Sequence, residues 1–124
     1  MKAPQSATGH PSISLEPQQL NSVRGILMRV LSPRLDPGGL QAWVFGSRAT
    51  GQARPYSDLD ILISRSEPLD WQERMAMRDA FEASNLPFRV DVVEASRLTG
   101  EFAQRVGLER LPLVLSPSLA VSGG

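Results

Sequence analysis

Three aspartates lie in segments whose residue pattern is that of β-strands. Asp58 and Asp60 stand in the run DLDILIS, and Asp91 stands in the run PFRVDVVE. Side chains alternate between the two faces of a strand, so Asp58 and Asp60 share one face. If the two strands are neighbours, Asp91 joins them and three carboxylates converge. Packed carboxylates repel one another unless a cation lies among them, and oxygen ligands suit Mg²⁺ or Mn²⁺. The pattern therefore predicts a metal site.

A glycine-rich turn, GSRATG, follows an apolar run and begins at Gly46. Glycine permits close backbone approach, and the amides that open a helix bind anions, so the turn predicts a phosphate site. Ser47 can donate its hydroxyl to a phosphate oxygen, and Arg48 either adds positive charge there or is solvated. A Walker loop would need a lysine directly after Gly51, where this chain has Gln52. Metal ions held by the aspartates would neutralise the phosphates in place of that lysine.

The elements that must position these residues follow from the periods of the apolar residues. Helical spacing predicts three helices, and β-branched or aromatic runs predict three strands, with LPLVLSP as a short edge strand. The predicted helices lie over 17–31, within 66–85 and around 98–106, and the predicted strands lie over 41–46, 58–64 and 87–94. In the second helix we expect Trp71, Met75, Ala80 and Phe81 to face the core. This order predicts a small mixed β-sheet with helices packed on it, an α/β or α+β architecture.

Length and composition limit the classes of function. The 124 residues suffice for one domain, which we expect over 15–116, between a flexible N-terminal arm (1–14) and a C-terminal tail (117–124). Because 13 basic residues balance 13 acidic ones, no general nucleic-acid binding is expected. The chain has no cysteine, so disulfides and thiolate metal sites are excluded. It has no apolar run of about 20 residues and no secretory pattern at its start, so we expect a cytoplasmic protein.

The glycine-serine pair and the aspartates together resemble a known superfamily. Gly46-Ser47, ten further residues, Asp58-Leu59-Asp60 and then a strand-borne Asp91 are similar to the nucleotidyltransferases that include DNA polymerase beta. The size of the chain and the span from Pro17 to Leu115 resemble the minimal nucleotidyltransferase (MNT) domain proteins. Many members of that family are antitoxins paired with HEPN-domain toxins. The resemblance implies the nucleotidyltransferase fold.

The same resemblance implies an activity and a role for each residue. Asp58 and Asp60 would be the paired ligands of two Mg²⁺ ions, with Mn²⁺ as the other candidate. Asp91 would complete the metal site and help to deprotonate the attacking hydroxyl. Gly46 and Ser47 would hold the β- and γ-phosphates of ATP. The implied reaction moves AMP from ATP to a hydroxyl, expected to be that of a tyrosine, on a partner HEPN toxin, which is thereby silenced.

Two other functions remain open at this point. The chain could be an antitoxin that neutralises its toxin by binding alone, although three converging carboxylates would then serve no purpose. It could instead transfer a nucleotide to a small-molecule hydroxyl, as aminoglycoside-modifying relatives do with an additional domain. Template-directed polymerisation is the least favoured reading, because a neutral minimal domain offers little surface for gripping phosphates. In either antitoxin reading we expect a HEPN partner in a hetero-oligomer, and no membrane.

Overall fold

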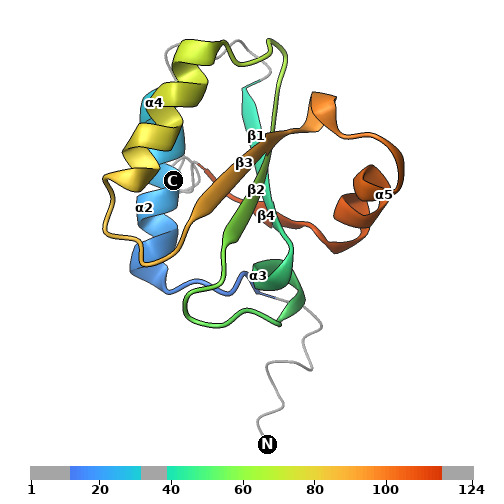
Figure 1. Ribbon diagram of the computed structural model, residues 1–124. Helices are drawn as coiled ribbons and strands as arrows, with labels where there is room; N and C mark the ends of the chain where they lie inside the picture. The colour runs from blue at the N-terminus through green and yellow to red at the C-terminus, as the bar shows by residue number, and fades with distance from the viewer. Residues whose placement is uncertain (1–11, 32–38, 116–124) are drawn as a thin grey trace, which may run out of the picture.

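The computed structural model describes residues 12–31 and 39–115 of the chain (Figure 1). The helices and strands are α2 (Pro17–Leu31), β1 (Leu40–Phe45), α3 (Ser47–Thr50), β2 (Leu59–Arg65), α4 (Trp71–Glu82), β3 (Val90–Glu94), the 3₁₀ turn η2 (Ala95–Arg97), α5 (Gly100–Glu109) and β4 (Leu111–Leu113). The predicted order of helix, strand, strand, helix, strand, helix is found, with the short helix α3 between the first two strands and β4 after the last helix. None of the helices within the described ranges is long and apolar enough to cross a membrane.

The four strands form one mixed sheet in the order β3-β2-β1-β4. Strand β1 runs antiparallel to both β2 and β4, whereas β2 runs parallel to β3. Parallel neighbours need a long connection, and α4 supplies it between β2 and β3. The prediction of a small mixed sheet with helices packed on it is confirmed. The two aspartate-bearing strands are neighbours, which meets the condition for their carboxylates to converge.

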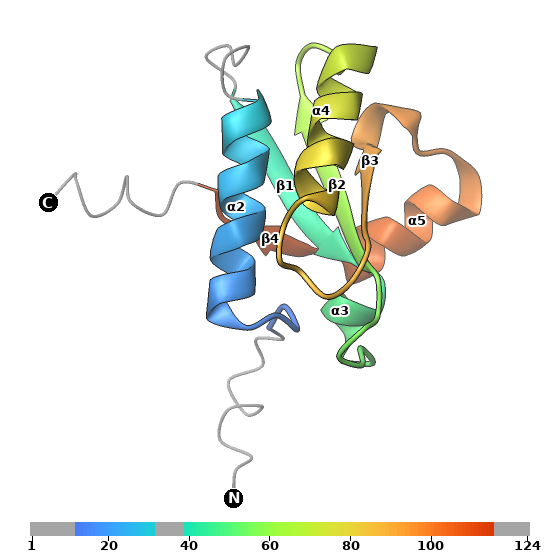
Figure 2. The same ribbon diagram turned by 60° about the vertical axis from the view of Figure 1, so that its left-hand side comes forward.

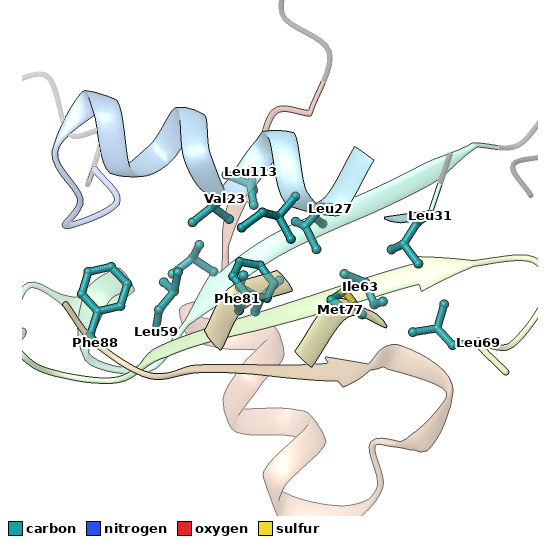
Figure 3. Close-up of a cluster of buried hydrophobic side chains, with 14 of the residues drawn as sticks. Val23, Leu27, Leu31, Leu59, Ile63, Leu69, Met77, Phe81, Phe88 and Leu113 are labelled. Carbon is teal, nitrogen blue, oxygen red and sulfur yellow. The ribbon is translucent and has the colours of Figure 1, made fainter. Parts of the chain in front are cut away.

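Helices α2 and α4 cover one face of the sheet, and α5 lies on the opposite side (Figures 1 and 2). The main core fills the space between α2, α4 and the sheet, where Val23, Leu27 and Leu31 of α2 are fully buried (Figure 3). A smaller apolar cluster joins α5 to the other face through Phe45, Leu62 and Val106. Asp60 and Asp91 share this second face with the apolar residues Trp43 and Val93, which pack against the cluster.

The predicted core positions of α4 are partly wrong. Phe81 is buried and Ala80 partly buried, but Trp71 is 68% exposed and Met75 is 42% exposed. Asp70 fixes the start of this helix, because its side chain accepts the amide of Glu73 while Glu73 accepts the amide of Asp70, which is a capping box. The buried positions then recur every four residues as Glu73, Met77 and Phe81. Positions 71 and 75 lie about two residues off that stripe and so reach the solvent.

Two residues of the predicted flexible arm (1–14) contact the folded domain. Ile13 packs against the main core, and the amide of Ser14 donates to the carbonyl of Arg48 at 2.8 Å. These two residues therefore belong to the folded part rather than to a flexible arm. Residues 1–11 and the predicted tail at 117–124 lie outside the described residues. The boundaries of the domain at 15 and 116 otherwise stay a prediction.

Candidate active site

The three aspartates lie at one end of the β2–β3 pair. Asp60 of β2 stands directly opposite Asp91 of β3 in the parallel register, and Asp58 immediately precedes β2. Leu59 and Ile61, which alternate with the aspartates, are fully buried in the main core. The carboxylates thus occupy the sheet face that α2 and α4 leave uncovered, as the alternation of side chains requires.

Negative charge is concentrated at Asp60. Burial raises the pKa of its carboxyl, and the neighbouring carboxylates of Asp91, Asp58 and Glu109 raise that pKa further, whereas the guanidinium of Arg105 lowers it. Ionising Asp60 therefore costs more here than it does in water, and a nearby cation would reduce that cost. The acidic residues around Asp60 offer carboxylate oxygens, which are the metal ligands that Mg²⁺ and Mn²⁺ prefer.

The three aspartates are near one another, but their carboxylates do not surround a common position where one metal ion could bind. In residues 12–31 and 39–115, no three acidic or histidine side chains are gathered closely enough to hold a metal ion as they stand. Asp91 is turned toward Arg89, whose Nε lies 3.7 Å from its Oδ1. The backbone sets the positions of the carboxylates, and rotation of the side chains would be needed to bring them onto one ion.

Gly46 brings the glycine-serine turn against this cluster. It directly follows β1, where Phe45 pairs with Asp60, and it has a φ of 74°, a conformation that residues with a side chain rarely adopt. A Cβ at this position would overlap Oδ2 of Asp60. Ser47 then begins the single turn of α3. The structure therefore places the predicted phosphate turn and the predicted metal ligands side by side.

Arg48 does not face this site, and the expectation that it contacts a phosphate is corrected. Its side chain is only 4% exposed, and burial lowers the pKa of its guanidinium. The guanidinium donates to four backbone carbonyls, and it lies 4.1 Å from the centroid of the Phe88 ring. Those carbonyls belong to Ser14, Arg54, Pro55 and Ser57. Arg48 thus stabilises the loop that leads into Asp58, because its guanidinium donates hydrogen bonds to carbonyls of that loop.

Helix α5 contributes three residues that sequence reasoning missed. Glu109 accepts the amide of Gly46 through Oε1 at 2.9 Å, and the ring of Phe102 meets the ring of Phe45 edge-on at 5.9 Å. The guanidinium of Arg105 lies 5.3 Å from the Phe102 ring centroid. Positions 102, 105 and 109 share one side of a helix, which is the only sequence signal that links them. Nothing in the sequence pairs that side with Gly46.

The fold and the site together define a class of protein. A family model described as "Polymerase beta, Nucleotidyltransferase" matches residues 39–114, and the chain belongs to this family. It is 33% identical over 97 residues to the Haemophilus influenzae protein named "Probable protein adenylyltransferase MntA". That match covers 78% of this chain and 80% of the relative. The resemblance stated from Gly46-Ser47 and the aspartates is thereby confirmed.

Solved structures show the same fold. A minimal nucleotidyltransferase of known structure matches with a TM-score of 0.57 and 27% identity, over 82% of this chain and all of that one. A second structure contains the tri-AMPylated HEPN toxin of Shewanella oneidensis in complex with an MNT antitoxin. A chain of that structure matches with a TM-score of 0.51 and 18% identity, over 84% of this chain and 87% of its own length. At that identity the second match speaks for the fold alone.

Proposed function

We propose that this chain transfers AMP from ATP to a hydroxyl of a partner HEPN toxin and acts as its antitoxin. The observation that carries the proposal is the register of β2 and β3, which sets Asp60 beside Asp91 with Gly46 against them. The name of the Haemophilus influenzae relative and the AMPylated toxin of the Shewanella oneidensis complex support AMP as the group and a HEPN toxin as the acceptor. We place the reaction in the cytoplasm, where ATP and Mg²⁺ are available.

Asp58, Asp60 and Asp91 are the proposed ligands of two Mg²⁺ ions, or of Mn²⁺. Their donors are all oxygens, and the crowding of negative charge at Asp60 would be relieved by a cation. When bound, such ions neutralise the triphosphate and stabilise the attacking and leaving oxygens of an in-line displacement. Asp91 would give up its 3.7 Å contact with Arg89 to take part.

The chain's own residues hold the phosphates and accept the proton. Gly46 has no side chain to keep a phosphate away, and the hydroxyl of Ser47 can donate to a phosphate oxygen. The acceptor hydroxyl oxygen forms a bond to the α-phosphorus of ATP while the bond from that phosphorus to the β-bridging oxygen breaks. Pyrophosphate leaves with the electron pair of the broken bond. The hydroxyl proton passes to a carboxylate oxygen of Asp91, which acts as the base.

The test is the intact mass of the partner HEPN toxin after incubation with this protein, ATP and Mg²⁺. We expect the toxin to gain one or more AMP units, because the hydroxyl of the toxin replaces pyrophosphate on the α-phosphorus. Asp58→Ala combined with Asp60→Ala should abolish the gain. Asp79→Ala, which removes an exposed carboxylate on α4 away from the aspartate cluster, should leave it intact.

A different result would favour one of the two other functions. If the mass of the toxin does not rise with any nucleoside triphosphate, and the doubly substituted protein still inhibits the toxin, the chain neutralises its toxin by binding alone. The toxin could instead show no mass gain while a small-molecule alcohol, such as an aminoglycoside, is adenylylated. In that case the proposed acceptor class is wrong, and the proposed transferase chemistry stands.

A further inference from the structure

A groove of about 790 Å³ runs along the outer edge of β3, between this strand and α4. We refer to it as the β3 groove. Its walls are the whole of β3 (Val90–Glu94), the arginines of α4 and η2, and the segment that enters β3. Phe81 and Phe88 give it an apolar floor. Figures 1 and 2 show α4 and β3 flanking one another, joined by the loop that precedes β3.

The backbone of β3 is open toward this groove. In the part of the chain that the structure describes, β3 is an end strand of the sheet and pairs with β2 alone. The amide of Leu59 donates to the carbonyl of Arg89 at 2.8 Å. Because parallel ladders alternate, Asp91 and Val93 direct their backbone groups toward β2, whereas Val90 and Val92 direct theirs into the groove. Such an edge is a template for an added strand.

The groove is continuous with the candidate active site. Asp91 lines the groove and stands opposite Asp60 in the register, so the same strand serves both. An occupant of the groove would therefore lie within reach of the carboxylate to which we assign the acceptor proton. Only the acceptor has a reason to occupy a position on that side, since the phosphate turn at Gly46 lies across the aspartates toward β1.

The charges of the groove select the kind of acceptor. Four arginines line it against three acidic residues, and three of the arginines are mostly exposed in loose ion pairs of 3.3 to 3.7 Å. These exposed arginines are Arg78, Arg89 and Arg97. Arg89 would be released from Asp91 once that carboxylate is used for catalysis. Exposed ion pairs of this kind are weak, so a carboxylate of an incoming segment can replace the acidic partner of each arginine.

We propose that the β3 groove binds an extended, acidic segment of the acceptor protein as an added strand on β3, and so presents its hydroxyl to Asp91. The inference rests on the proposed function for the identity of the acceptor. Backbone pairing with Val90 and Val92 supplies affinity that does not depend on sequence, and the arginines select carboxylates on the segment. A segment of about five residues spans the strand, which is some 17 Å long at the usual rise.

Charge reversal at the rim tests the groove with a matched control. Arg97→Glu and Arg78→Glu place negative charge on the groove, whereas Arg29→Glu reverses an exposed arginine on α2. We expect each groove variant to raise the toxin concentration that gives half-maximal AMP transfer, by on the order of tenfold for the two together, with the Kd for ATP unchanged. Arg29→Glu should match the wild type. Equal effects of the groove variants and Arg29→Glu would overturn the proposal.

A cross-link provides a second test that does not require turnover. Arg97→p-benzoylphenylalanine is irradiated in the complex with the HEPN toxin, in parallel with Arg29→p-benzoylphenylalanine. The proposal expects the first to attach to the toxin segment that carries the modified hydroxyl, and the second not to. Cross-links to that segment from position 29 alone would overturn it. If the wild type transfers no AMP, the proposed function fails. The cross-link from position 97 to an acidic toxin segment, or its absence, then still decides whether the β3 groove binds the toxin.

Discussion

At the scale of single residues, Asp60 is where burial and negative charge act on the same carboxyl. Both raise its pKa in the folded state. The stability that such a group contributes is complete below its unfolded pKa and is lost as the pH rises through the folded pKa. At neutral pH an ionised Asp60 therefore destabilises the protein when no cation is bound, and the penalty disappears in acid.

We therefore expect Asp60→Asn to raise the Tm of the metal-free protein at neutral pH, since the amide keeps the shape and removes the charge. The gap should close as the pH falls toward the ordinary pKa of an aspartate, about 3.9. Thermal unfolding in EDTA from pH 3.5 to 8 measures this, with Asp79→Asn as the exposed control. A lower Tm for Asp60→Asn at pH 7, relative to both other proteins, would show that Asp60 makes a stabilising contact instead.

Arg48 is a second residue whose role the structure decides. Replacing it with Met would leave part-buried carbonyls without their donor. Arg48→Met should therefore lower the free energy of unfolding by about 2–4 kcal/mol. The exposed Arg54→Met should change it by less than about 0.5 kcal/mol. Urea unfolding provides both values. If Arg48→Met were as stable as the wild type and instead bound ATP more weakly, Arg48 would be a phosphate ligand after all.

These two residues show what the sequence could and could not predict about the site. The alternation of side chains along a strand is a property of the backbone, so the common face of Asp58 and Asp60 follows from their positions in the sequence. Asp91 joins them only because β3 is the parallel neighbour of β2. The direction of Arg48 depends on a loop of irregular conformation and on Phe88, which is far along the chain. No periodic pattern encodes such a contact.

At the scale of elements, α5 holds the glycine turn in place. Its Glu109 accepts the amide of Gly46, and its Phe102 packs on Phe45 just before that turn. The helix could be predicted from its apolar spacing, but its side of the sheet could not, because that side depends on the strand order. Strands β3 and β4 run parallel at opposite edges of the sheet, and a right-handed connection between them passes over the face opposite α4. The start of α4 was readable in principle, since the capping pair Asp70 and Glu73 is visible in the sequence.

Substitutions at Glu109 separate its hydrogen bond from its charge. Glu109→Gln keeps an oxygen for the Gly46 amide, whereas Glu109→Ala removes it. We expect Glu109→Ala to lower kcat/KM for ATP about tenfold, the equivalent of one hydrogen bond of about 1.4 kcal/mol, and Glu109→Gln to stay within about twofold of the wild type. Steady-state kinetics with varied ATP measures both. Equal losses for the two variants would mean that the negative charge matters and the hydrogen bond does not.

At the scale of the whole molecule, the two faces of the sheet have different roles. One face of the sheet packs on α2 and α4 and forms the main core, while the other face carries the polar residues of the site. This division follows from strands whose buried and polar residues alternate, and it was predictable for that reason. The exposure of Trp71 and Met75 was not, because periodicity alone does not fix which of two neighbouring apolar stripes on a helix meets the sheet.

The small size of the domain makes its Tm responsive to ligands. A ligand that binds only the folded state stabilises it by RT ln(1 + [L]/Kd), about 2.7 kcal/mol at a hundred times its Kd. We therefore expect Mg²⁺ with a non-hydrolysable ATP analogue at that excess to raise the Tm by 10 °C or more, given roughly 4–8 °C per kcal/mol for a small domain.

Differential scanning calorimetry measures the shift in Tm, which EDTA should abolish. Asp58→Ala with Asp60→Ala should lose it as well, because both substitutions remove proposed ligands, whereas Asp79→Ala should keep it. A shift that survives in EDTA and in the double variant would place the nucleotide away from the aspartates, and the register of β2 and β3 would then have no catalytic meaning.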